Sequence, residues 1–261
     1  MDKVLSTFTK VVLLFLYAPI VAVIVYSFNS SPVSYKFEGV SLKWYVQLFG
    51  NTALMDSLKV SAIVGLAAAA MATAIGLCTA IALARFRVRG KGFFLAAVLL
   101  PLVIPEIVIG VSLLAVFSTA GMTMGLMTLI LGHVVITLPM TSMVLIGAMG
   151  TMDPSLNEAA TDLGATPWQI FIKVLLPLLK PSLMAAFLLS FTTSFSNIVI
   201  STFTAGVGTT TLPLRIYSTL RTGLTPELNA LGALLVGLTL AVILVVGVSQ
   251  MRRILAGPVT N

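Results

Sequence analysis

Charged residues are scarce in this sequence. Asp, Glu, Lys and Arg make up 9% of its 261 residues, against about 25% in soluble domains. Hydrophobic residues make up 58% of the chain, and its mean hydropathy is +1.10. A soluble fold of this length could not bury so much apolar surface, whereas a lipid bilayer covers it. The composition therefore excludes an ordinary soluble domain and indicates a membrane protein.

Residues that build metal and redox sites are also scarce. Cys78 is the only cysteine, which excludes an intrachain disulfide and a cysteine-based metal site. His133 is the only histidine and lies in an apolar segment, where we expect a hydrogen-bonded packing role rather than metal binding. The sequence has no G-x-x-x-x-G-K-[ST] pattern, so it does not form the loop that cradles ATP phosphates. These absences argue against an intramembrane enzyme and against ATP binding by this chain.

Long apolar segments are abundant by contrast. A membrane-spanning helix needs about 20 mostly apolar residues, and the sequence predicts an all-α membrane protein with six such helices. The predicted spans are Val11–Phe28, Ser57–Ala84, Phe93–Phe117, Met124–Met149, Leu183–Phe203 and Leu228–Val248. The first is long for the core of a signal peptide, and no A-x-A cleavage site follows it.

The positive charges predict the orientation of these spans. The net charge is +7, but no basic face with interleaved aromatic residues indicates nucleic-acid binding. If six spans alternate, one side of the membrane receives Lys3, Lys10, Arg85, Arg87, Arg89, Lys91, Arg252 and Arg253. Lys and Arg are enriched in cytoplasmic loops, so both termini are predicted to be cytoplasmic. We expect three parts: an N-terminal span with an external amphipathic segment (1–56), a membrane core (57–250) and a cytoplasmic tail (251–261).

Two external connections are predicted to contain short helices. Ser41–Phe49 has the pattern of a short amphipathic helix, and its aromatic residues suit the membrane interface. Leu214–Leu220 is a second possible short helix, in the connection before the last span.

The cytoplasmic connection between the fourth and fifth spans carries strong helix signals. Asp153 can cap a helix that has Pro154 at its first position, and Gly164 can end it in the left-handed conformation. A small apolar face at helical spacing is formed by Leu156, Ala159, Ala160 and Leu163. A second start follows, because Thr166, Pro167 and Gln169 form a capping box. Pro177 and Pro181 are expected to disturb the chain before the fifth span.

Two interpretations of this short helix stay open from its residues alone. Ala159 and Ala160 allow close approach of another surface, and Glu158 and Asp162, four residues apart, can meet basic groups on a partner. The helix would then dock on a partner protein and transmit motion. It could equally be a simple surface helix of a loop.

The same loop resembles the EAA loop of ABC importer permeases. It reads Glu158-Ala159-Ala160, three residues, Gly164, nine residues and then Val174-Leu175-Leu176-Pro177, with Val174 in the usual place of Ile. The resemblance covers about residues 58–248 and implies the type I importer permease fold. It also implies a coupling helix around Pro154–Leu163 that docks on a cytosolic ATPase through Glu158, Ala159, Ala160, Asp162 and Gly164.

The resemblance also implies partners and a location. Two ATPase subunits would bind ATP and Mg, a second permease would complete the translocation path, and an extracytoplasmic binding protein would deliver the solute. The protein would lie in the bacterial inner membrane and need no cofactor of its own. Candidate contacts with the binding protein are Arg215, Tyr217 and Arg221, in the external connection before the last span.

Glu106 is the only acidic residue inside a predicted span, directly after Pro105. A central acid is expensive in a bilayer and is expected to face the bundle interior, a partner or a water-filled path. It could attract a cationic solute, or it could be a hydrogen-bonded structural acid. Ser194, Ser196 and Asn197 could hydrogen-bond a polar solute on the same path, or join helices to one another.

Several segments resemble the polyamine-type subfamily of these permeases, among them Tyr26–Ser31, Trp44-Tyr45, Leu212–Ser218 and Thr225–Ala230. That subfamily tends to carry acids after a Ser-Phe pair in the fifth span, where this chain has the neutral Ser196 and Asn197 after Ser194-Phe195. The expected solute is therefore a small amine-bearing one, either polyamine-like or an aminoalkyl phosphonate or amino-acid derivative.

The alternative function is a secondary transporter driven by an ion gradient. Such a protein would favour inverted repeats, discontinuous helices and intramembrane ionisable groups. Glu106 and the prolines fit it, but the capped cytoplasmic helix is left unexplained.

Overall fold

The computed structural model describes residues 2–32, 36–85, 89–153, 155–223 and 225–255. The described residues contain α-helices, two short non-α helical turns and no β-strand beyond an isolated bridge between Asn29 and Val40. The predicted all-α class is therefore confirmed for this part of the chain. Two compact units are present, residues 1–55 with 216–261 and residues 56–215.

The first unit is built from helices near the two ends of the chain. They are α1 (Asp2–Ser27), α2 (Lys43–Gly50), α12 (Pro226–Leu255) and the last residues of α11 (Leu212–Thr222). α12 packs against both α1 and α2. The predicted short helices at Ser41–Phe49 and Leu214–Leu220 are confirmed as α2 and α11, because both present an apolar face at helical spacing.

The connection before α2 is organised by a buried asparagine. Asn29 Oδ1 accepts hydrogen bonds from the backbone N–H groups of Ser31 and Glu38, and Asn29 Nδ2 donates to the carbonyl of Lys36. The indole Nε1 of Trp44 donates to the carbonyl of Asn29 at 2.6 Å. At the other end of α2, Asn51 Nδ2 donates to Glu227 Oε1 at the start of α12. These bonds fix the connection without a β-sheet.

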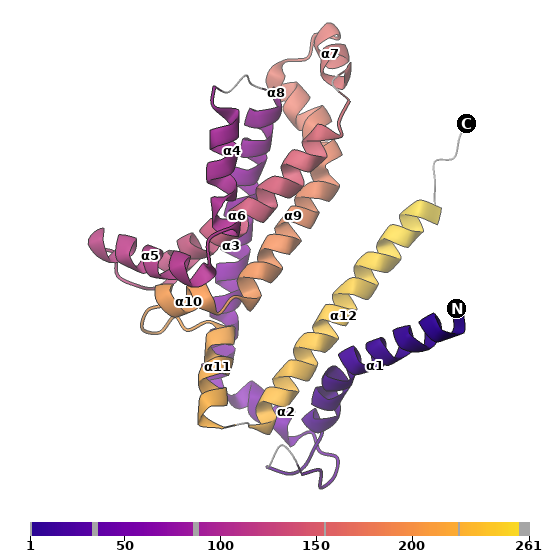
Figure 1. Ribbon diagram of the computed structural model, residues 1–261, viewed down its shortest axis with the longest axis vertical. Helices are drawn as coiled ribbons and strands as arrows, with labels where there is room; N and C mark the ends of the chain where they lie inside the picture. Colours follow the sequence, from indigo (N-terminus) through magenta and orange to yellow (C-terminus); the bar gives the residue numbers. More distant parts are fainter. Residues whose placement is uncertain (1, 33–35, 86–88, 154, 224, 256–261) are drawn as a thin grey trace. The chain divides into compact units, whose positions relative to one another are not determined.

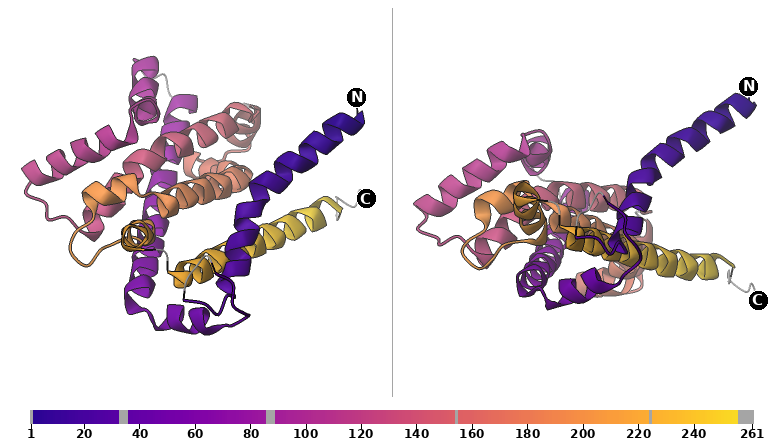
Figure 2. Two further views of the ribbon diagram at one scale, coloured as in Figure 1. Left: turned by 60° about the horizontal axis from the view of Figure 1, so that its bottom comes forward. Right: turned by 90° about the horizontal axis from the view of Figure 1, so that it is seen from below.

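The second unit is a helical bundle (Figures 1 and 2). Its elements are α3 (Thr52–Arg85), α4 (Lys91–Leu99), the turn η1 (Leu100–Leu102), α5 (Glu106–Thr119), α6 (Leu126–Gly150), α7 (Ser155–Asp162), α8 (Pro167–Ile170), the π turn η2 (Phe171–Leu175), α9 (Leu176–Ser196), α10 (Val199–Thr204) and the start of α11. α6 and α9 form its most extensive contact. Their apolar contact continues onto α3 in a core made of Ala80, Leu145, Met149, Leu175, Leu179 and Ala186.

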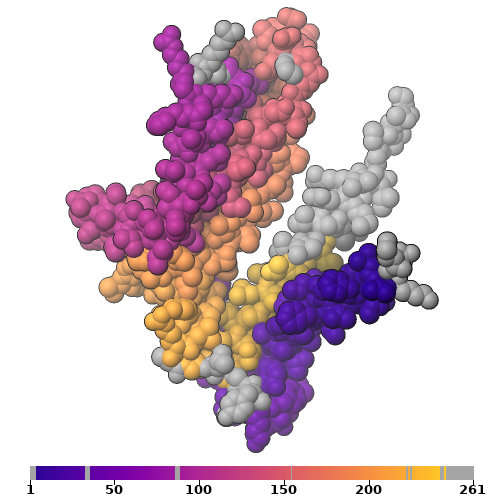
Figure 3. All heavy atoms as spheres, in the orientation of Figure 1, coloured from indigo at the N-terminus to yellow at the C-terminus, as the bar shows by residue number. Residues whose placement is uncertain are grey.

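The third predicted span is broken rather than straight. Lys91–Leu102 and Glu106–Thr119 meet at an angle of 103°, and α5 turns sharply away from α4 in Figures 1 and 3. Pro105 is the cause, because proline lacks an N–H and disfavours a helical conformation at the residue before it. Gly110 then lets α5 lie against α10, since a Cβ at that position would come within 2.4 Å of the Phe203 ring.

The fifth predicted span, Leu183–Phe203, has different bounds in the structure. The membrane-length helix begins at Pro167 and ends at Ser196, and a separate helix, α10, follows it. The helix is disturbed near the prolines, as expected, but it is not ended by them. Pro181 lies inside α9, and the wider π turn over Phe171–Leu175 ends two residues before Pro177, in the turn with which a proline ring would clash in a regular α-helix.

Four helices of the described residues are long and apolar enough to cross a membrane, and the bent pair supplies a fifth. They include the first predicted span, seen as Val4–Ser27. α12 contains the sixth predicted span, but the structure describes only the backbone of this helix at 242, 243 and 245–255. The protein is therefore a multi-pass membrane protein, and the count of six remains a prediction.

Candidate functional site

The connection after α6, predicted to be cytoplasmic, folds into a short, capped helix. Residue 154 lies outside the described residues, and α7 covers Ser155–Asp162 within the predicted Pro154–Leu163. The backbone N–H of Ser155 donates to Asp153 Oδ1 at 2.9 Å. This bond holds the pKa of the Asp153 carboxyl below its ordinary value. The predicted cap at Asp153 is thus in place.

The C-terminal end of α7 has the expected left-handed glycine. Gly164 has φ +78°, and no atom would obstruct a Cβ there, so the backbone conformation alone favours glycine. The Gly164 N–H donates to the carbonyl of Thr161, and the Ala165 N–H donates to the carbonyl of Ala160. This pair of bonds is a Schellman motif. It makes α7 a helix with a defined length and end.

The second helix start in this loop is also as predicted. Gln169 N–H donates to Thr166 Oγ1, and the Thr166 N–H donates to Gln169 Oε1, which completes the capping box. The stub α8 leads through η2 directly into α9. Motion of the loop can therefore reach the core through a continuous helix.

The face of α7 that carries the EAA residues is largely uncovered. Glu158, Ala159 and Asp162 are exposed, and Ala160 is half-buried. Leu163, at the end of the predicted apolar face, keeps 88% of its surface exposed. The uncovered face of α7 thus combines one apolar side chain with small and acidic residues.

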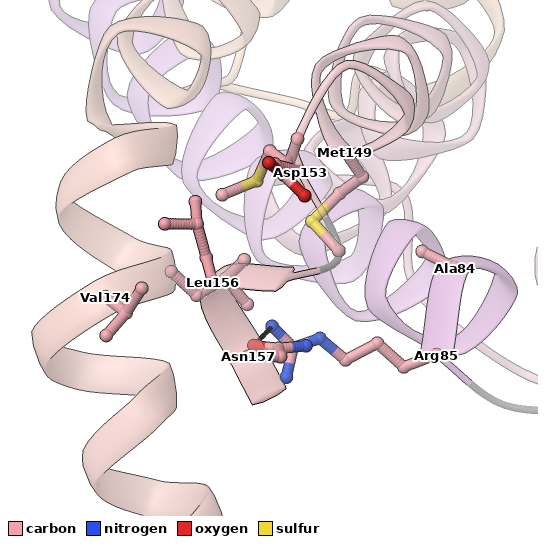
Figure 4. A pocket seen from close by; sticks show the side chains of 9 residues that line it. Ala84, Arg85, Met149, Asp153, Leu156, Asn157 and Val174 are labelled. Carbon is pink, nitrogen blue, oxygen red and sulfur yellow. Dashed lines mark hydrogen bonds between the residues drawn. The ribbon is translucent and has the colours of Figure 1, made fainter. Parts of the chain in front are cut away.

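A small cavity lies behind α7 (Figure 4). Its volume is about 120 Å³, and its lining comes from α3, from α6 and the residues after it, from α7 and from η2: Ala84, Arg85, Met149, Met152, Asp153, Leu156, Asn157, Val174 and Leu175. Arg85 Nη2 donates to Asn157 Oδ1 at 2.7 Å across it. The last residue of α3 is thus bonded to the residue just before Glu158.

The second candidate site lies where two helix breaks meet. Glu106 is the first residue of α5, directly after the bend at Pro105, and Asn197 lies in the gap between α9 and α10. Asn197 Nδ2 donates a short hydrogen bond to Glu106 Oε1. Both side chains are half-buried. In the part of the chain that the structure describes, no Lys or Arg forms an ion pair with Glu106.

The two serines expected near Asn197 lie in different surroundings. Ser194 is buried and bonds to the ring of His133 on α6 at 2.7 Å. Ser196 is exposed, and its hydroxyl donates to the carbonyl of Thr192 on its own helix. The structure thus brings Glu106 and Asn197 together, bonds Ser194 to His133 and leaves Ser196 apart.

His133 and Ser201 belong to this cluster, although sequence reasoning did not assign them to it. His133 Nε2 lies 3.2 Å from Ser201 Oγ on α10, and Ser201 Oγ donates to the carbonyl of Asn197 at 3.0 Å. The hydrogen-bonded packing role expected of His133 is confirmed. The only signal in the sequence was that His133 is a lone polar residue in an apolar segment, and this does not predict which residues it bonds to.

The three candidate contacts on α11 already have partners within the chain. Arg215 Nε donates to Ser57 Oγ at 3.4 Å. Arg221 donates to the hydroxyl of Tyr217 and also lies over its ring, 4.5 Å from the centroid. Tyr217 keeps 43% of its surface exposed, so the Tyr217–Arg221 pair remains accessible to another protein.

Residues 72–256 match the family described as "Binding-protein-dependent transport system inner membrane component". The chain belongs to this family. It is the permease subunit of an ABC importer, as the EAA loop predicted, and membership does not favour the ion-gradient alternative.

Similar proteins extend this result over most of the chain. The spermidine/putrescine transport system permease protein PotC of Haemophilus influenzae is 39% identical over 91% of this chain and 93% of its own length. PotC of Escherichia coli K12 is 37% identical over 91% and 90%. The putrescine transport system permease protein PotI of Escherichia coli K12 is 37% identical over 85% and 82%.

The fold has a counterpart among solved structures. A chain from the crystal structure of a bacterial ABC transporter involved in the import of the acidic polysaccharide alginate superposes with a TM-score of 0.74, covering 96% of this chain and 95% of that chain. Its sequence identity is 18%, so this likeness supports the importer permease fold and carries nothing about the solute.

Proposed function

We propose that this permease imports a polyamine-like cation and that Glu106 supplies the carboxylate with which this chain attracts it. The observation that carries the proposal is the position of Glu106 at the meeting of two broken helices, bonded to the neutral Asn197. An ionisable residue within a membrane segment commonly marks a solute or ion path, and non-helical backbone at membrane depth is tolerated where it lines a cavity or is buried in protein. The relatives named for spermidine and putrescine support the choice of a polyamine over an aminoalkyl phosphonate or amino-acid derivative.

Electrostatics explains why one carboxylate is useful there. A neutral amide brings no opposite charge to a carboxylate, and an amine cation that reaches the carboxylate is attracted more strongly than in water because the surrounding dielectric constant is low. Asn197 keeps the side chain in place without neutralising it. A second carboxylate for the other end of a diamine would come from the second permease, which forms the other half of the path.

ATP hydrolysis belongs to partner subunits in this proposal. Two ATPase subunits bind ATP and Mg and receive α7 in a surface groove, through Glu158, Ala159, Ala160, Asp162 and the turn at Gly164. The support is the uncovered face of α7 and its rigid caps. An extracytoplasmic binding protein delivers the solute near α11, with Arg215, Tyr217 and Arg221 as polar contacts, and both chain termini are cytoplasmic.

Uptake into proteoliposomes tests the choice of solute. The complex of this chain with its second permease, ATPase pair and binding protein should take up labelled putrescine only when ATP is enclosed with the ATPase. Spermidine should compete, whereas 2-aminoethylphosphonate, a zwitterion, and 1,4-butanediol, which has putrescine's carbon chain without charge, should not. Stronger competition by the zwitterion than by spermidine would contradict the proposal.

A further inference from the structure

The break between α9 and α10 needs support from outside its own chain segment. α9 ends at Ser196, Asn197 has an extended backbone (φ −75°, ψ 124°), and α10 begins at Val199. Within the low dielectric of a membrane protein, backbone groups released by a break must find other partners. Two come from the break itself, because the Ile200 N–H donates to Asn197 Oδ1 and the Asn197 carbonyl accepts from Ser201 Oγ.

His133 on α6 contacts both sides of this break. Its side chain is 1% exposed. Nδ1 lies 2.7 Å from Ser194 Oγ, on the last turns of α9, and Nε2 lies 3.2 Å from Ser201 Oγ, on α10. The ring therefore connects the end of one helix to the beginning of the next.

The hydrogen-bond directions follow from counting protons. Ser201 has one hydroxyl proton, and it donates this proton to the Asn197 carbonyl. Ser201 Oγ must therefore accept from His133, which places the N–H of the neutral ring on Nε2. Nδ1 is then an acceptor, and Ser194 donates to it. The ring thus accepts from α9 and donates to α10, so a substitute needs one acceptor and one donor in the same places.

These bonds form an unbroken series that ends at Glu106. Ser194 donates to His133, His133 to Ser201, and Ser201 to the Asn197 carbonyl, while the Asn197 side chain donates to Glu106. We propose that His133 is a positioning residue for Glu106, because it holds the α9–α10 break in the conformation in which Asn197 faces the carboxylate. The effect of this positioning role on transport rests on the proposed function, in which Glu106 attracts the solute.

Proximity between positions 106 and 197 tests the positioning role without any solute. The complex is assembled in a Cys78→Ala background with Glu106→Cys and Asn197→Cys, and disulfide formation under a mild oxidant is measured. The yield should fall about fivefold when His133→Leu is added, as expected for the loss of two intramembrane hydrogen bonds. The matched control is Thr141→Val, a buried hydroxyl on the same helix that bonds to its own helix at Thr137, and it should leave the yield unchanged.

Two further substitutions of His133 keep the test decisive if His133→Leu does not assemble. His133→Gln extends far enough to keep a donor near Ser201 and should restore most of the yield. His133→Asn reaches Ser194 but not Ser201, and its yield should be as low as that of His133→Leu. Wild-type yield in assembled His133→Asn or His133→Leu overturns the proposal.

Transport gives the second readout. If His133 acts through Asn197, His133→Leu should raise the half-saturating putrescine concentration in the wild-type background and have no further effect beside Asn197→Ala. Equal effects in both backgrounds would overturn the positioning role. The failure of the proposed function is distinguishable, because wild-type uptake in Glu106→Gln would refute it while leaving the disulfide yields as predicted.

Discussion

At the scale of single residues, Gly164 is the clearest case in which backbone geometry dictates residue type. Its φ of +78° is in the left-handed region, where a β-branched side chain is strained by roughly 1–2 kcal/mol. With such a side chain, the backbone would relieve the strain by leaving the left-handed conformation, which would change the direction in which the chain leaves α7.

Gly164→Val should therefore misplace α7 while the protein still inserts and binds the second permease. We expect substrate-stimulated ATPase activity of the reconstituted complex to fall several-fold. Gly90→Val is the matched control, because Gly90 has a φ of +75° and lies outside the EAA loop. Normal stimulation in assembled Gly164→Val would contradict a coupling role for this helix.

Charge on α7 gives an independent test at the same scale. Glu158 is exposed, so Glu158→Lys should leave the fold intact and act only through a partner surface. Substrate-stimulated ATPase should decrease in Glu158→Lys, and more so at low ionic strength, because salt screens exposed charges. A decrease that salt does not alter would exclude charge complementarity as the cause.

At the scale of elements, the hydrogen bond between Arg85 and Asn157 joins the end of α3 to α7. If this bond sets the position of α7, Arg85→Ala and Asn157→Ala should lower ATPase stimulation by similar amounts, about two- to fivefold, as expected for one exposed charged hydrogen bond. The double variant should be no worse than either single one.

Lys59→Ala is the control for this prediction. Lys59 is an exposed cation near the other end of the same helix, paired with Asp56, and its loss should not change the stimulation. Additive losses in the Arg85→Ala and Asn157→Ala double variant would mean that the two residues act separately.

Local signals explain which elements the sequence could predict. α7, α8, α2 and α11 were predictable because caps and amphipathic spacing are encoded within a few residues. The path of the fifth span was not, because the sequence contains Pro177 and Pro181 but not the π turn at Phe171–Leu175 that lets the helix continue. Pro105 indicated a disturbance, yet the angle of 103° depends on α5 packing against α10.

The candidate sites also differ in how far they could be predicted, because one is local in the sequence and the other is not. The EAA residues form one local segment, so spacing alone brings them together. Glu106 and Asn197 are 91 positions apart, and His133 lies 61 and 68 positions from its two serine partners. One sequence without aligned relatives contains no signal for such tertiary pairs.

At the scale of the whole molecule, topology is the first prediction to test. Both termini and the connection around Arg85–Lys91 should be cytoplasmic, because Lys and Arg gather there. In a Cys78→Ala background, Val88→Cys, at a position outside the described residues, should resist an impermeant thiol reagent in intact spheroplasts and react after permeabilisation. Labelling in intact spheroplasts would reverse the predicted orientation.

The side predicted to be external offers a prediction about the binding protein. Tyr217 is accessible beside Arg221, so a photoreactive side chain at position 217 should crosslink to the binding protein in a complex trapped during transport. A matched position is Leu163, which is also exposed but predicted to be cytoplasmic, and it should capture the ATPase instead. Adducts with lipid or detergent alone at position 217 would exclude this contact.

The central claim is that the charge of Glu106 acts on the solute, and two substitutions test it most directly. Glu106→Gln keeps the size and most of the hydrogen bonding to Asn197 but removes the charge, whereas Glu106→Leu removes both. Uptake of labelled putrescine is measured in proteoliposomes and normalised to assembled complex and basal ATPase activity. The account predicts that both variants assemble and that uptake falls at least tenfold in each. A Glu106→Gln variant with wild-type uptake, beside a Glu106→Leu variant that fails to assemble, would contradict the account and make Glu106 a structural acid.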